Sequence, residues 1–124
     1  VNLNVVMFRD RKRKVRRIFQ IAEFESVGDK AEANIIYRWV PDEDKIILHN
    51  ESARFFEDIS RNTGMSDSEL HKNLENKKNI LSWLVKNNIR ELNNFGKVIN
   101  LYYADTNLLN ELIAKNDIKR ILGG

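Results

Sequence analysis

The residues best suited to chemistry in this sequence form one basic cluster near the amino terminus. Seven arginines and lysines lie within residues 9–17, where Asp10 is the sole acidic residue. This segment carries a net charge of +6, so the rest of the 124-residue chain carries −3. Arginine and lysine bind carboxylates and phosphates through charged N–H donors. The cluster therefore predicts a contact with an anionic surface, which leaves nucleic acid, another protein and acidic lipid open.

The residues around the cluster favour an exposed hairpin tip. One apolar segment, residues 3–8, precedes the cluster, and a second, residues 15–24, begins at the carboxyl end of the cluster. Charge on a tip between two strands also deters edge-to-edge pairing. Phe8 and Phe19 lie at the outer ends, so no aromatic side chain interleaves with the cations, as base stacking would require. The hairpin tip is the favoured interpretation. A small nucleic-acid-binding module that uses the basic hairpin at residues 9–17 is the alternative.

Other reactive groups are sparse. The chain has no cysteine, which excludes disulfides, thiolate metal sites and cysteine catalysis. His49 and His71 have no second histidine at ligand spacing, so we predict surface histidines. The five glycines build neither G-x-x-x-x-G-K-[ST] nor G-x-G-x-x-G, the loops that cradle phosphates. The sequence therefore predicts no catalytic, nucleotide-binding or metal site here, and no cofactor of the chain's own.

The first half of the sequence has the pattern of strands. Residues 15–24 are apolar on both alternating faces, which is typical of a strand in a covered sheet. Residues 33–40 alternate, and a short fourth strand begins at Lys45. Gly28 and Pro41 mark the turns between these segments. We expect Trp39, like Trp83 further on, to be a core residue rather than a ligand-stacking one.

The second half has the pattern of helices. Asn50 or Ser52 can cap a first helix that ends near Gly64, and Ser66 with Glu69 forms a capping box for the second. Apolar spacing predicts a third helix around residues 92–102 and a fourth from Thr106 to residue 122. The prediction is an α+β fold: an N-terminal β-hairpin or meander over residues 1–50, then a C-terminal bundle of three to four helices over residues 51–124.

No apolar run approaches the 18 residues that mark a transmembrane helix, and no signal peptide is recognisable. The chain starts at Val1 without an initiator methionine and enters a strand-like run at once. We therefore expect a piece of a longer protein.

Three segments in order carry a resemblance to a known family. The first is R-R-I-x-x-I-A-E at residues 16–23, and the second is Y-R-W-V-P-D-E-D at residues 37–44. The third runs from G-M-S-x-x-E-L at residues 64–70, through a W-L-V helix and an N-I-R turn, to Y-Y at 102–103. Together they resemble the C-terminal part of the hexameric type II and type IV secretion ATPases, which include the pilus and archaellum assembly ATPases. The second and third segments are similar to the archaeal branch.

The resemblance spans roughly residues 1–105 and implies a fragment without the catalytic machinery. The family's Walker A loop, acidic Walker B strand and histidine motifs lie upstream and have no counterpart here. Residues 1–50 would be the end of a RecA-like core, and residues 51–124 a helical domain. The parent would be a hexamer that hydrolyses ATP with Mg²⁺ at the cytoplasmic face of the membrane. It would drive protein export or filament assembly by pushing on a membrane platform protein, with no nucleic acid involved.

The resemblance also suggests where the fragment meets other proteins. We expect Arg13, Arg16, Arg17 and Glu23 to be subunit or partner contacts. Glu23 lies in an apolar strand and needs a partner if it is buried, and Arg17 on the same strand alternation is the candidate. Apolar strand faces that have lost their neighbours should also seek a substitute. The isolated fragment is therefore expected to form a dimer or a larger assembly, with exchanged strands as one route.

Overall fold

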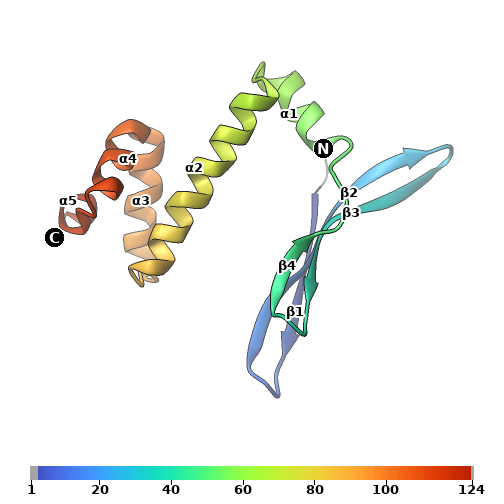
Figure 1. The fold of residues 1–124 in the computed structure, drawn as a ribbon, viewed down its shortest axis with the longest axis horizontal. Coiled ribbons are helices and arrows are strands. Elements are labelled where there is room, and N and C mark those ends of the chain that lie inside the picture. Colours follow the sequence, from blue (N-terminus) through green and yellow to red (C-terminus); the bar gives the residue numbers. More distant parts are fainter. Residues whose placement is uncertain (1–2, 124) are drawn as a thin grey trace. The chain divides into compact units, whose positions relative to one another are not determined.

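The computed structural model describes residues 3–123, which form four strands followed by five helices (Figure 1). The α+β prediction is confirmed. The elements are β1 (Leu3–Asp10), β2 (Val15–Val27), β3 (Lys30–Val40), β4 (Lys45–Leu48), α1 (Phe55–Thr63), α2 (Asp67–Lys86), α3 (Leu92–Ala104), α4 (Thr106–Ala114) and α5 (Ile118–Leu122). They fall into two compact units, one ending at Leu70 and the other beginning at His71. The division into domains at residue 50 stays a prediction.

The four strands form one antiparallel meander in the order β1-β2-β3-β4. Left-handed residues help to close its turns: Lys14 (φ 56°), Gly28 (φ 63°) and Asp44 (φ 50°). The register shifts twice, opposite Val6/Met7 where β2 has one extra residue, and again at Ile21/Ala22. Such bulges reverse the alternation of side chains along a strand. This reversal matters below for the position of Glu23.

Most of the large apolar side chains of the sheet are exposed. Buried apolar positions on the strands are few: Ala22, Ile36 and Trp39. The exposed ones include Met7 at 62% and Leu48 at 57%. The sequence pattern predicts a covered sheet, but in the described residues of this chain much of the apolar surface of the sheet is exposed to solvent.

The second unit has a closed apolar core. Seven buried residues from four helices form it: Ile80, Trp83, Leu84, Val98, Leu109, Leu112 and Ile121. Trp83 also donates its indole N–H to Asn116 Oδ1 at 2.9 Å. Both tryptophans are buried, as predicted for core residues.

The helix boundaries match the predicted signals in part. Gly64 (φ 74°) ends α1, and Ser66 Oγ accepts from the Glu69 amide at 3.2 Å near the start of α2. The predicted fourth helix is wrong in two respects, so the described helices number five. Asp105 rather than Thr106 caps α4, by accepting from the Leu108 amide, and the segment breaks at left-handed Asn116 before α5. An aspartate carboxylate caps at least as well as a threonine hydroxyl, which explains the shift by one residue.

Candidate functional site: the Glu23 cap and the basic turn

The Glu23 carboxylate joins the sheet to helix α1. Its residue is 1% exposed, near the middle of β2. It accepts hydrogen bonds from Asn34 Nδ2 on β3 at 2.9 Å and from Ser52 Oγ at 2.8 Å. It also accepts from the backbone amides of Ala53 and Phe55. We call this set of contacts the Glu23 cap.

The Glu23 cap satisfies backbone donors that a helix cannot satisfy by itself. The first amides of a helix have no partner within the helix, and its positive end favours a carboxylate. Arg54 occupies the N-cap position of α1 but contributes no side-chain hydrogen bond, and its amide also lies 3.3 Å from each Glu23 oxygen. Ser52, a predicted cap, lies two residues before the N-cap position, and its Oγ accepts from the Phe55 amide at 3.0 Å. A strand residue thus completes the start of a helix about 30 residues later.

These hydrogen bonds determine the charge of Glu23. Burial alone would raise the pKa of the carboxyl, but the donors of Asn34, Ala53, Ser52 and Phe55 outweigh that effect and lower the pKa from 4.5 to about 2. Glu23 is therefore a carboxylate at neutral pH. Helix α1 has no fully buried residue, so the cap is a principal polar attachment of α1 to the sheet.

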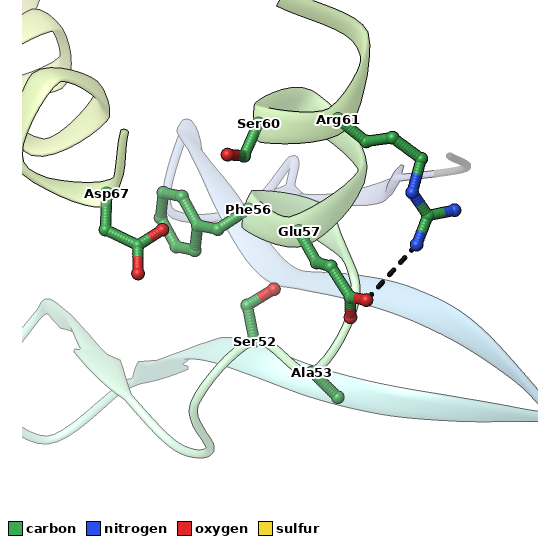
Figure 2. Close-up of a pocket in the computed structure, with 7 residues that line it drawn as sticks. All are labelled: Ser52, Ala53, Phe56, Glu57, Ser60, Arg61 and Asp67. Atoms are coloured by element: carbon green, nitrogen blue, oxygen red, sulfur yellow. Dashed lines mark hydrogen bonds and ion pairs between the residues drawn. The ribbon is translucent and has the colours of Figure 1, made fainter. Parts of the chain in front are cut away.

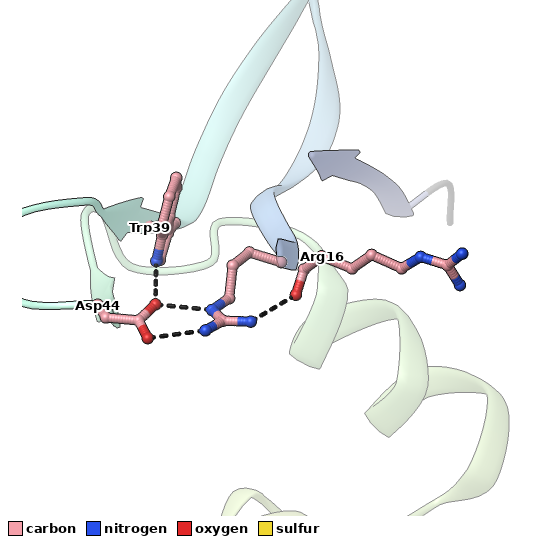
Figure 3. Close-up of polar contacts among 4 residues, drawn as sticks. Arg16, Trp39 and Asp44 are labelled. Carbon is pink, nitrogen blue, oxygen red and sulfur yellow. Dashed lines mark hydrogen bonds and ion pairs between the residues drawn. The ribbon is translucent and has the colours of Figure 1, made fainter. Parts of the chain in front are cut away.

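The predicted pairing of Arg17 with Glu23 is wrong. Arg17 instead forms a two-pronged ion pair with Asp44, with Nε to Oδ1 at 2.7 Å and Nη2 to Oδ2 at 2.8 Å (Figure 3). The bulge in β2 between the two positions breaks the alternation on which the prediction rests. The sequence flags Glu23 as a buried charge that needs partners. Those partners lie in β3 and in the segment before α1, which no spacing in the sequence connects to Glu23.

Asp44 connects three strands at one end of the sheet. It accepts from the indole N–H of Trp39 at 2.9 Å as well as from Arg17 (Figure 3). The bonds from Arg17 and then Trp39 lower the pKa of Asp44 from 3.8 to about 2. The Trp39 ring stacks on Phe8 of β1 with centroids 5.4 Å apart. These contacts fix the β3–β4 turn against the strands that carry the basic cluster.

The basic turn, residues 9–17, is held in shape from within. Asp10 accepts from the amides of Lys12 and Arg13, and its other oxygen accepts from Arg13 Nε at 2.8 Å. Of the predicted contact residues, Arg13 and Arg17 are thus paired inside the chain. The side chain of Arg16 points away from Asp44 and Trp39 (Figure 3). Five cations form no ion pair with another described residue: Arg9, Arg11, Lys12, Lys14 and Arg16. The basic turn and the Glu23 cap are separate features of the same hairpin.

A shallow hollow on the first unit does not bring catalytic groups together. It is an open depression of about 440 Å³ beside α1, lined by Ser52, Ala53, Phe56, Glu57, Ser60, Arg61 and Asp67 (Figure 2). Glu57 and Arg61 pair across one helical turn at 3.2 Å. Within residues 3–123 no three histidine, cysteine or acidic side chains are grouped so as to hold a metal ion. In the same range, no helix is long and apolar enough to cross a membrane.

Comparison with known proteins places the chain in a family. Residues 43–121 match the family model described as PilB3-like, C-terminal. No match emerges among the curated proteins. The family match includes β4 and reaches into α5, and it overlaps the second and third segments of the resemblance to pilus-assembly and secretion ATPases. Because the match covers more than half of the chain, this protein belongs to the PilB3-like C-terminal family.

Proposed function

We propose that this chain is the C-terminal module of a hexameric ATPase of the type II secretion and type IV pilus class, from the archaeal branch. The parent binds ATP and Mg²⁺ through residues that precede this module. The module converts movements of the RecA-like core into protein export or filament assembly. The family match at residues 43–121 and the ordered motifs at residues 16–44 support this assignment.

The Glu23 cap is the observation that carries the proposed mechanism. A displacement of β2 moves the carboxylate that holds the first amides of α1, so α1 must follow or lose its cap. Helix α1 ends at Gly64, and the chain then enters α2, which leads into the second unit. Hydrolysis that repacks a ring subunit could in this way be converted into displacement of a partner. The proposed partner is a membrane platform protein at the cytoplasmic face.

The proposal is tested by a substitution that separates ATP hydrolysis from filament assembly or secretion in the full-length ATPase. The Glu23→Gln substitution retains the size of the side chain but removes the charge, and one of its two polar atoms becomes a donor that faces other donors. We expect ATP hydrolysis and the hexamer to persist while filament assembly or secretion is lost. The matched control is Glu43→Gln, an exposed glutamate of the β3–β4 turn. Normal assembly in a correctly folded Glu23→Gln protein would reject the mechanism.

Arg13, Arg16 and Arg17 have a secondary place in this proposal. Arg13 and Arg17 stabilise the end of the sheet through Asp10 and Asp44, while Arg16 is free to reach a neighbouring subunit. Arginine suits such a contact because its planar fork binds carboxylates with two hydrogen bonds.

A further inference from the structure

Both ends of strand β2 carry a pair of like charges that face each other across the sheet. Arg9 of β1 is directly opposite Arg16 of β2, and Glu25 of β2 is directly opposite Glu32 of β3. Like charges at directly opposed positions destabilise a strand pair. None of these four side chains forms an ion pair with another described residue. Each pair therefore lacks a counter-charge that the described part of the chain could supply.

The two pairs cannot neutralise each other within one molecule. Arg16 and Glu25 are nine residues apart on the same strand, which corresponds to about 30 Å. Within the sheet, the β1–β2 turn and the β2–β3 turn lie at opposite ends (Figure 1). A counter-charge for either pair must therefore come from outside the described residues of the same copy.

We propose that the Arg9–Arg16 pair of one copy of this chain binds the Glu25–Glu32 pair of a second copy. Two arginine forks face two carboxylates in this contact, so each pair supplies the counter-charge that the other lacks. A nucleic acid would satisfy the basic end alone and would be repelled by the acidic end, which makes a second copy the better match. The contact joins different surfaces of the two copies, and such contacts generate rings when the rotation closes. The inference deepens the proposed subunit contact and identifies the acceptor surface on the neighbouring subunit.

Charge reversal at each end tests the proposal. Sedimentation velocity at low ionic strength measures self-association of this chain. The wild type is compared with Arg9→Glu/Arg16→Glu and with Glu25→Arg/Glu32→Arg. In each variant the two opposed pairs carry the same sign, so its self-association should weaken about tenfold or more. Mixing the two variants should restore assembly. Added salt should weaken the wild-type assembly, because exposed charges are screened. The control, Lys77→Glu/Lys78→Glu on α2, has the same charge change as the first variant and should associate like the wild type.

Several results would overturn the pairing. They are a wild-type monomer at low ionic strength, association that neither variant weakens, loss in only one of the two variants, and a mixture that fails to assemble. Circular dichroism of both variants verifies folding. Each substituted pair still places two like charges opposite each other, so the repulsion within the sheet is the same as in the wild type. The Glu23 experiment measures coupling in the full-length ATPase, whereas this one measures association of the chain itself. Failure of one can therefore be distinguished from failure of the other.

Discussion

The two units of this chain are stabilised in different ways. The unit that begins at His71 encloses an apolar core in which Val98 and Leu109 have no exposed surface. The sheet unit instead depends on polar contacts, chiefly the Glu23 cap and the Arg17–Asp44–Trp39 group, and leaves apolar side chains open. A unit with a closed core can be stable alone, whereas an open sheet is suited to being covered. The difference indicates which part of the chain depends on other surfaces.

The largest expected effect concerns the closed core. Leu109→Ala should lower the free energy of unfolding of the helical unit by about 2–5 kcal/mol, because it leaves a cavity among fully packed neighbours. The same substitution at Leu48, which is 57% exposed on β4, should cost less than about 1 kcal/mol. Denaturant unfolding monitored by circular dichroism measures both. Equal losses of unfolding free energy for the two substitutions would contradict the distinction between the two units.

The next effect concerns the polar contacts of the sheet. Glu23→Gln should lower the free energy of unfolding at neutral pH by about 3 kcal/mol, which is what a pKa of about 2 in place of 4.5 corresponds to. The pKa of the folded state is the lower one, so this stability is present above 4.5 and is lost as the pH falls towards about 2. The difference between wild type and variant should therefore shrink over that interval. Glu43→Gln is the control, and a pH-independent difference would contradict the assignment.

The smallest effects come from two glycines with opposite expected signs. Gly96 lies inside α3 with open space where a Cβ would be, so Gly96→Ala should stabilise by about 0.5–1 kcal/mol. Gly64 ends α1 at φ 74°, so Gly64→Ala should destabilise by about 1 kcal/mol. Thermal unfolding of both variants measures the pair. Stabilisation by Gly64→Ala would show that the end of α1 tolerates a side chain.

The comparison of the units also explains what the sequence can predict. Alternation and helical spacing locate the strands and most helices because these patterns are local. The partners of Glu23 are not local: Asn34 and Ser52 reach it only after the sheet forms. The bulge near Phe19 reverses the strand alternation, which misassigns Arg17. The opposed Arg9–Arg16 and Glu25–Glu32 pairs likewise require the register, which the sequence alone does not give.

Amide hydrogen exchange of this chain tests the central contrast most directly. Exchange measures the free energy of local opening, residue by residue. The amides around Trp83, Val98 and Leu109 should be protected by a larger free energy than those of β1 and β4, whose apolar side chains are exposed. Equal protection in both units, or stronger protection in the edge strands of the free chain, would contradict the account.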